Sequence, residues 1–416
     1  MTDNIKDLEA QEVLARLDER IGVDEEIING EKRRTFHHST KYLFDIEQFV
    51  NAIAQEYKET GRAKGVREWV DRHGHLQTRP TRLGKKYYGK MNEWIERYSE
   101  KHRYAPRVEA FHDACKKIGI LGGKKRFWFG VLGDTDVDHH VSFAYWFNRL
   151  IERIHEHCST REFKERERLR KLHERHMEDS VVEFEKALFS EKGRSRWLVL
   201  SLTLKYQSQY RRWITLEDVQ RHRERFFAAR RYNKLMGDIK AYAWALEEGE
   251  TTGFHLHVIL FYACVTRDDE RMAKLIGDYW VDAATQGMGA YWNSNEERRK
   301  VWYEKKGHGV GVGQIDRTND RMRESLRVNL KYLVKAEQYF QIKAEGKVRT
   351  FDMSDVPKKL KSGCPRVDAV IGEEGINDDA EQSGCAATNV AGDIPWEYAV
   401  MSKTGNPDAL DGHGTA

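Results

Sequence analysis

The stretch AYAWALEEGETTGFHLHVILFY, residues 241–262, indicates the fold more clearly than any other part of the chain. It contains two strand-like runs, 241–247 and 254–262, separated by a short turn with glycines. Neighbouring strands with a short, glycine-containing connection form antiparallel hairpins. The sequence therefore predicts a β-hairpin at this point and an antiparallel sheet built around it.

The flanking sequence supplies the other elements of an α+β domain with a central antiparallel sheet and flanking helices. Residues 195–204, SRWLVLSLTL, are rich in Leu and Val and predict another strand. Helical periodicity and glycine spacing predict the remaining elements. These are helices over 216–235, 268–284 and 320–343 and a glycine-spaced strand over 307–315.

Four regions follow from the change of pattern along the chain. Residues 1–125 are mixed and mostly helical, and their interleaved aromatic and basic residues could bind DNA or form an ordinary helical surface. Residues 126–190 are expected to be a helical arm or linker, and residues 191–355 the α+β domain. Residues 356–416 lack periodicity and are expected to be a disordered acidic tail.

The distribution of charge suits a polyanionic partner. The net charge of the 416 residues is +4, but residues 367–416 hold ten acidic residues and one lysine, a net −9. Residues 1–366 therefore carry +13, as expected of a protein that binds nucleic acid.

No run of 18 apolar residues is present, and the first twenty residues lack an apolar signal core, so we expect a cytoplasmic protein with no membrane partner. The five cysteines include no C-x-x-C pair, which argues against a disulfide framework and a zinc ribbon.

His255 and His257 are the candidate metal ligands. Two other H-x-H pairs exist, but His73 and His75 fall in a polar loop, and His155 and His157 in a predicted helix. Residues two apart share a face only in a strand, so only the pair at 255 and 257 can reach one ion.

A carboxylate completes the expected metal site. Glu247 ends the preceding strand and can return beside the histidines, while Glu248 competes because one residue of register changes the face. Two imidazoles and a carboxylate suit Mg²⁺ or Mn²⁺, and zinc is an open alternative.

A tyrosine with neighbouring lysines follows on the last predicted helix, in KYLVK, residues 331–335. Tyr332 and Lys335 are three residues apart and share a helical face. A nearby ammonium and a metal could activate the hydroxyl as a nucleophile towards phosphate. The alternative is a tyrosine that packs on the sheet, with lysines in solvent.

In this order, these segments resemble the HUH endonucleases, and most closely the inovirus-type replication proteins of filamentous phages and prophages. The shared features are LVLSLTL (198–204), His255-Leu-His257 with Glu247, GMGAYWNSN (287–295) and the KYLVK helix. The resemblance covers about 190–355. Families with two tyrosines would place the second tyrosine four positions before the first. This chain has Val328 there, so it resembles the one-tyrosine enzymes.

The resemblance implies an HUH endonuclease fold and a nickase that starts rolling-circle replication. Tyr332 would attack the scissile phosphate, with Lys335 assisting, Lys331 contacting DNA and Tyr339 as a possible second tyrosine. The ligand would be single-stranded or hairpin origin DNA. Host helicase, DNA polymerase and single-strand-binding protein would be partners.

Other classes remain open from sequence alone. A relaxase or a single-strand transposase shares the same site chemistry. A non-catalytic DNA-binding regulator with an HUH-like fold is a second alternative, disfavoured by the presence of every expected site residue. A zinc hydrolase unrelated to DNA is a third, disfavoured by the basic body and the Tyr-Lys helix.

Overall fold

The computed structural model describes twelve segments of the chain, all of which belong to one unit, residues 1–362. The segments are 23–28, 31–36, 41–100, 102–123, 125–136, 140–191, 193–249, 253–263, 267–305, 307, 309–342 and 349–357. The expected disorder of the tail from residue 358 onward lies outside them. None of the helices in these segments is long and apolar enough to cross a bilayer.

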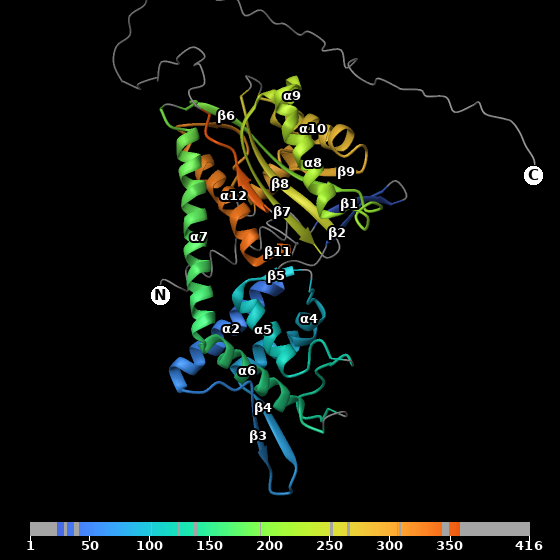
Figure 1. Ribbon diagram of the computed structural model, residues 1–416, viewed down its shortest axis with the longest axis vertical. Helices are drawn as coiled ribbons and strands as arrows, with labels where there is room; N and C mark the ends of the chain where they lie inside the picture. The colour runs from blue at the N-terminus through green and yellow to red at the C-terminus, as the bar shows by residue number, and fades with distance from the viewer. Residues whose placement is uncertain are drawn as a thin grey trace, which may run out of the picture. The chain divides into compact units, whose positions relative to one another are not determined.

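The described residues form an α+β structure (Figure 1). The strands are β1 Val23–Ile28, β2 Glu31–Phe36, β3 Val66–Val70, β4 Leu76–Pro80, β5 His102–Tyr104, β6 Arg196–Tyr206, β7 Ile239–Gly249, β8 Gly253–Tyr262, β9 Gly289–Asn293, β10 Gly313–Asp316, β11 Phe340–Ile342 and β12 Phe351–Met353. The helices are α2 Lys41–Thr60, α3 Arg82–Tyr87, η1 Tyr88–Lys90, α4 Met91–Glu96, α5 Pro106–Lys117, α6 Phe143–Ser159, α7 Arg161–Leu188, α8 Leu216–Ala228, η2 Ala229–Arg231, α9 Lys234–Gly237, α10 Asp269–Tyr279, η3 Trp280–Ala284, α11 Glu297–Lys305 and α12 Asp320–Tyr339.

The main sheet is antiparallel and has the strand order β10-β6-β8-β7-β12. Strand β9 also pairs with β6, along residues 202–206, while β10 pairs with residues 196–199 of the same strand. The predicted hairpin is confirmed as β7 and β8, and β8 is the middle strand of this order.

Helices cover both faces of the sheet because its strands bury side chains on both sides. Leu200, Leu202 and Leu204 of β6 pack with α8, α10 and η3 on one face. Val199 and the alanines of β7 pack with α7 and α12 on the other. Figure 1 shows these two layers on either side of β7 and β8. We call them the α8 face and the α12 face.

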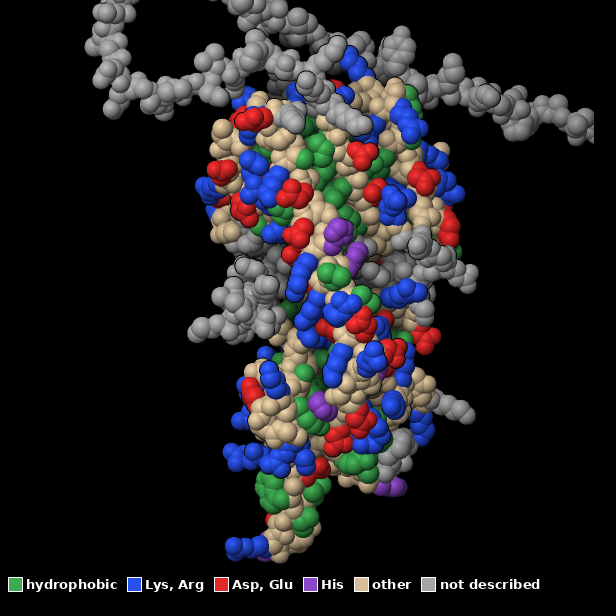
Figure 2. Space-filling model, turned by 60° about the vertical axis from the view of Figure 1, so that its left-hand side comes forward, with side chains coloured by type: hydrophobic (Ala, Val, Ile, Leu, Met, Phe, Trp, Pro, Cys, Tyr) green, Lys and Arg blue, Asp and Glu red, His purple; other side chains and the backbone are tan. Residues whose placement is uncertain are grey.

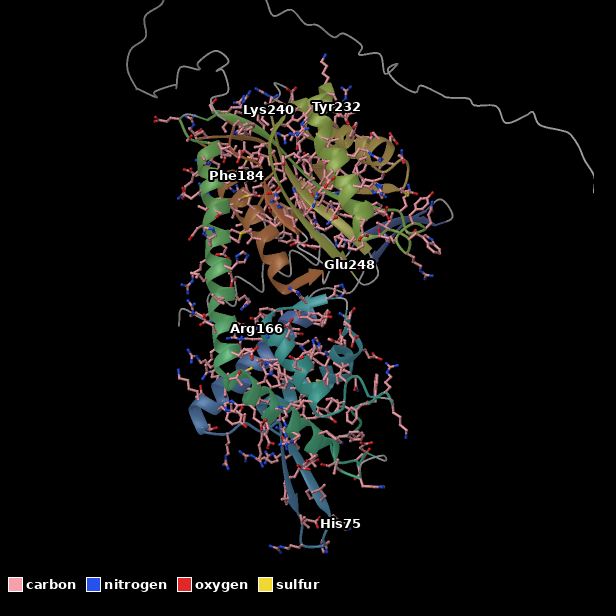
Figure 3. All side chains as sticks on the ribbon, in the orientation of Figure 1. His75, Arg166, Phe184, Tyr232, Lys240 and Glu248 are labelled. Carbon is pink, nitrogen blue, oxygen red and sulfur yellow. The ribbon has the colours of Figure 1, made fainter. Side chains whose placement is uncertain are left out.

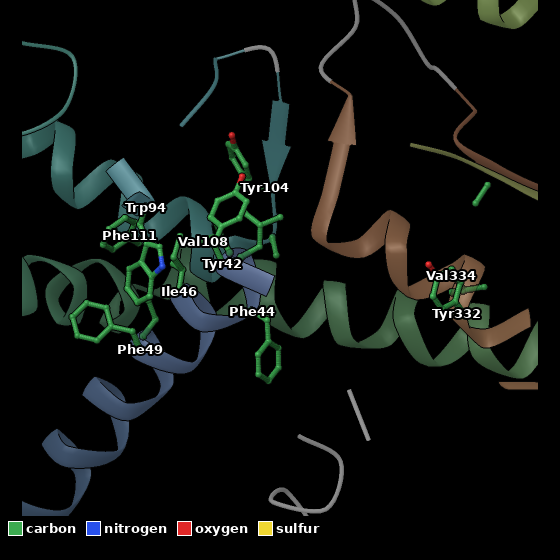
Figure 4. Close-up of a cluster of buried hydrophobic side chains, with 14 of the residues drawn as sticks. Tyr42, Phe44, Ile46, Phe49, Trp94, Tyr104, Val108, Phe111, Tyr332 and Val334 are labelled. Carbon is green, nitrogen blue, oxygen red and sulfur yellow. The ribbon is translucent and has the colours of Figure 1, made fainter. Parts of the chain in front are cut away.

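The helices before residue 160 pack around an aromatic core that is continuous with the α12 face. Phe49 of α2 stacks on Phe147 of α6, with ring centroids 5.8 Å apart. Trp94 meets Phe111 edge to face at 5.6 Å (Figure 4). Because α6 contributes to this core, it is part of the N-terminal packing and does not form a separate arm.

The helical pattern of residues 141–190 is divided at Thr160. The Thr160 backbone is extended, and its side chain accepts a hydrogen bond from the amide of Phe163, which caps α7. A capping threonine satisfies an amide that a new helix leaves unpaired. The chain therefore forms two helices here instead of one continuous helix.

Several predicted boundaries differ from the structure. The helix expected over 216–235 ends at Ala228 and is followed by the short helices η2 and α9. The last helix ends at Tyr339, where the chain turns into β11 and pairs with β5. The glycine-spaced strand is limited to Gly313–Asp316, the residues that pair with β6. The helix from 268 begins at Asp269, and its last turn is a π-helix, Trp280–Ala284.

A buried carboxylate joins α7 to α12. Glu185 of α7 has no solvent exposure. Its two oxygens accept hydrogen bonds from Nε of Arg323 at 2.7 Å and Nε of Arg327 at 2.8 Å. The two arginines lie about one helical turn apart on α12, so their bonds to Glu185 fix the position of α12 along α7.

Removing this carboxylate should destabilise the fold. Glu185→Ala leaves two guanidinium groups partly buried without their partner, which typically costs about 3–5 kcal/mol. Glu183→Ala on the same helix removes an exposed carboxylate paired with Lys186, and it should cost less than about 1 kcal/mol. Urea unfolding followed by circular dichroism measures both. Equal stability of the two variants would contradict a structural role for Glu185.

Candidate metal centre

The pairing of β7 with β8 places three potential metal ligands on one face. Glu247 lies directly opposite His255, and Ala245 lies opposite His257. Residues opposite one another in an antiparallel pair point to the same side, as do residues two apart on a strand. The predicted convergence of Glu247 with the two histidines is therefore confirmed as geometry, on the α12 face.

The ligand atoms are close enough to bind one ion. Nε2 of His257 lies 3.4 Å and Nε2 of His255 3.8 Å from Oε2 of Glu247. One atom from each residue can be chosen so that all lie within 4.8 Å of one another. An ion about 2.1 Å from each atom fits these separations. Among the described residues, this is the one group of three or more His, Cys, Asp or Glu side chains close enough to hold a metal ion.

Two buried polar atoms at this point have no hydrogen-bond partner among the described residues. They are Nε2 of His257 and Oε1 of Glu247. Buried polar atoms are nearly always paired, because leaving them unpaired costs free energy. A cation between them would satisfy both, so the residues present fit a divalent metal.

A threonine orients one of the histidines. Oγ1 of Thr203, on β6, lies 3.0 Å from Nδ1 of His257. When Nδ1 donates to this hydroxyl, Nε2 carries the lone pair that a metal needs. Thr203 was missed by the sequence analysis, although its position opposite His257 on the next strand follows from the sheet register.

Electrostatics keep the site ready to bind a cation. Burial, together with the charge of His257, lowers the pKa of His255 to about 4, so this imidazole is neutral at pH 7. Burial raises the pKa of Glu247, but the neighbouring imidazoles of His257 and His255 outweigh this effect, and the net pKa is lowered. A neutral imidazole beside an ionised carboxylate is the state that binds metals.

The competing carboxylate, Glu248, has a different partner. Its Oε2 lies 3.1 Å from Nε2 of His102, on β5. Figure 3 labels Glu248 near the end of β7, where the chain approaches β5. Strand alternation turns it away from the histidine pair, so Glu247, and not Glu248, shares the face of the two histidines.

Tyr332 lies beside the three candidate metal ligands. It is buried, with 5% of its surface exposed, and its ring centroid is 6.3 Å from that of His257 at an interplanar angle of 78°. Figure 4 shows Tyr332 on α12, next to Val334. Lys331 is half-buried on the same helix. The side chains of Lys335 and Tyr339 lie outside the described part of the chain.

The other histidine pairs do not converge on a shared site. His73 and His75 lie at the exposed turn between β3 and β4, with ring centroids 6.4 Å apart. On α6, His155 stacks on Tyr57 at 3.5 Å, whereas His157 packs against Phe163. The prediction that helical H-x-H residues diverge is confirmed.

The metal site is tested by Mn²⁺ binding to the full chain, measured by isothermal titration calorimetry. We expect one site, which His255→Ala and His257→Ala abolish. Glu247→Gln should weaken binding by more than about 100-fold, and Thr203→Val by about 10–100-fold, the usual effect of losing a group that orients a ligand.

Glu248→Gln is the matched control for Glu247→Gln, since it removes the same charge one residue away on the opposite face. Its Mn²⁺ affinity should remain near that of the wild type. Loss of binding in Glu248→Gln with binding retained in Glu247→Gln would show that the ligand set is wrong.

No protein-family model, curated protein or solved structure matches this chain.

Proposed function

We propose that this protein is a metal-dependent, tyrosine-type DNA nickase of the HUH superfamily that starts rolling-circle replication. The observation that carries the proposal is the placement of Tyr332 against His257, a member of the Glu247, His255 and His257 group. A helical tyrosine that only packs on a sheet has no need of a carboxylate and two histidines beside it. The combination suits phosphoryl transfer to a tyrosine hydroxyl.

The residues have distinct roles in this proposal. Glu247, His255 and His257 would hold a divalent ion, Mg²⁺ or Mn²⁺, which would polarise the phosphoryl oxygens of the DNA. Tyr332 supplies the nucleophile. A tyrosine hydroxyl has a pKa near 10 and needs cationic surroundings to become reactive, a task that Lys335 would share.

The reaction conserves the phosphodiester energy. The Tyr332 oxygen forms a bond to phosphorus, and the bond between phosphorus and the 3′ oxygen of the preceding nucleotide breaks. The tyrosine gives up its proton, and the departing 3′ oxygen gains one. The products are a 5′-phosphotyrosine link and a free 3′-OH, from which a polymerase can extend.

The charge of the chain supports DNA as the substrate. Residues 1–366 carry +13, and Figure 2 shows Lys and Arg side chains spread over one face among acidic ones. Distributed phosphate contacts of this kind give affinity that depends little on any one residue. Binding would therefore be separable from chemistry.

Tyr332→Phe should abolish covalent adduct formation and leave the DNA affinity within about twofold of the wild type, because the variant loses only the hydroxyl. The adduct is measured on a denaturing gel after incubation with labelled single-stranded origin DNA and Mg²⁺. The affinity is measured by fluorescence anisotropy.

Tyr339→Phe, seven residues later on the same helix, is the matched control. About 10 Å of helix separates the two positions, too far for both hydroxyls to reach one phosphate. Tyr339→Phe should nick and rejoin like the wild type. An adduct that persists in Tyr332→Phe and disappears in Tyr339→Phe would assign the nucleophile to Tyr339.

A further inference from the structure

A second concave site lies on the α8 face of the sheet, which is opposite the histidine pair. It is a pocket of about 780 Å³, within the usual range for ligand sites. Side chains from α8, η2 and β7 line it, with Arg349 and Asp352 from the segment that contains β12. Figure 3 labels Lys240 at the pocket's end of β7.

The pocket has an excess of positive charge. Five cationic side chains and two carboxylates line it, a net +3. The carboxylate of Asp352 pairs with Arg349 at 3.0 Å, but Glu224 approaches Arg223 only to 3.8 Å. Lys240 donates to the carbonyl of Gly237 and lies 3.5 Å from Asp238, whereas Arg231 is exposed and pairs with no carboxylate among the described residues. The lining therefore has positive charge available for an anion.

The floor of the pocket is a layer of aromatic rings and guanidinium groups. Arg223 lies over the ring of Trp244 at 4.4 Å, and Arg230 over the ring of Tyr242 at 4.8 Å. Phe227 packs against Tyr242, with ring centroids 4.3 Å apart. Trp244 is itself buried, so the guanidinium planes that lie over the rings are the flat groups on which a nucleobase can stack.

Arg223 is the most informative residue of this layer. Its side chain is 14% exposed, and burial lowers its pKa from the ordinary value. Its hydrogen bond to the carbonyl of Arg349 is long, at 3.4 Å. A desolvated guanidinium with weak partners is costly, and an anionic ligand would offset that cost.

We propose that this pocket binds nucleotides of single-stranded DNA, with bases on the ring and guanidinium layer and phosphates on Arg231 and Lys240. The inference rests on the proposed function for the identity of its ligand, and it adds a DNA contact on the sheet face opposite the nucleophile. Stacking requires unpaired bases, so a duplex cannot use the layer. An acidic peptide would use the charge but would leave the flat layer without a role.

The test measures binding of the full-length protein to a fluorescent oligothymidylate by anisotropy, in EDTA and across a salt series. The variant Arg231→Ala with Lys240→Ala removes two expected phosphate contacts. Its plot of log affinity against log salt should be shallower by about 1.4, and its affinity about 10-fold lower at ~0.1 M salt.

The matched control is Arg168→Ala with Lys186→Ala, which removes two exposed charges from α7, away from the pocket. Its slope should equal that of the wild type. Equal effects of the two double variants would show that the DNA affinity depends on net charge alone. That result would contradict the proposal that this pocket binds DNA.

Arg223→Lys separates stacking from charge, because it keeps the cation and loses the planar face. We expect roughly fivefold weaker DNA binding with an unchanged salt slope. This loss of affinity is a modest share of the usual contribution of base stacking. Thermal unfolding should give the wild-type Tm, which shows that the layer still folds. Wild-type affinity in this folded variant would contradict base stacking.

Competition distinguishes the two sources of a nucleotide. Free thymidine triphosphate should displace the oligonucleotide only weakly, since it offers one base and one site. Full displacement at micromolar concentration would assign the pocket to free nucleotides instead of DNA. Binding of an oligothymidylate is measured without a cleavage step, so the outcome is independent of whether Tyr332 is the nucleophile.

Discussion

The antiparallel register between β7 and β8 determines which side chains can act together in this protein. It places Glu247 opposite His255 and sends Leu246 and Leu256 into the core of the α8 face. A shift of one residue would bury Glu248 with the histidines and turn the leucines to the wrong side. The hydrophobic packing of both faces therefore fixes the geometry of the candidate metal centre. Glu247 and the two histidines share one face because the neighbouring leucines are buried on the other.

The tyrosine is placed by a different set of contacts. Leu330 and Leu333 of α12 are buried against the α12 face of the sheet, and Glu185 holds the helix to α7 through two arginines. Tyr332 thereby lies beside His257, with ring centroids 6.3 Å apart. The pocket on the α8 face uses the same sheet from its other side, since Trp244 and Glu247 are three residues apart on β7 and point to opposite faces. One strand thus contributes to both sites.

The sequence predicted the elements whose patterns are local. Alternation and the glycine turn identified the β7–β8 hairpin, and i, i+2 spacing selected His255 and His257 from three H-x-H pairs. Contacts that depend on which strands are neighbours were missed. Thr203 contacts His257 because β6 lies next to β8. His102 contacts Glu248 although more than a hundred residues separate them in the sequence. The second pocket was missed because its lining comes from separate segments. The glycine-spaced strand was predicted too long, since spacing alone does not supply packing.

In the proposed reaction, Tyr332 forms a covalent bond with DNA beside a metal held by Glu247, His255 and His257. The most direct measurement incubates the protein with single-stranded origin DNA and Mn²⁺, digests the adduct with nuclease and protease, and locates the modified residue by tandem mass spectrometry. We expect a phosphonucleotide on Tyr332 alone, absent when EDTA replaces the metal. A nucleotide on another residue, or an equal yield in EDTA, would contradict it.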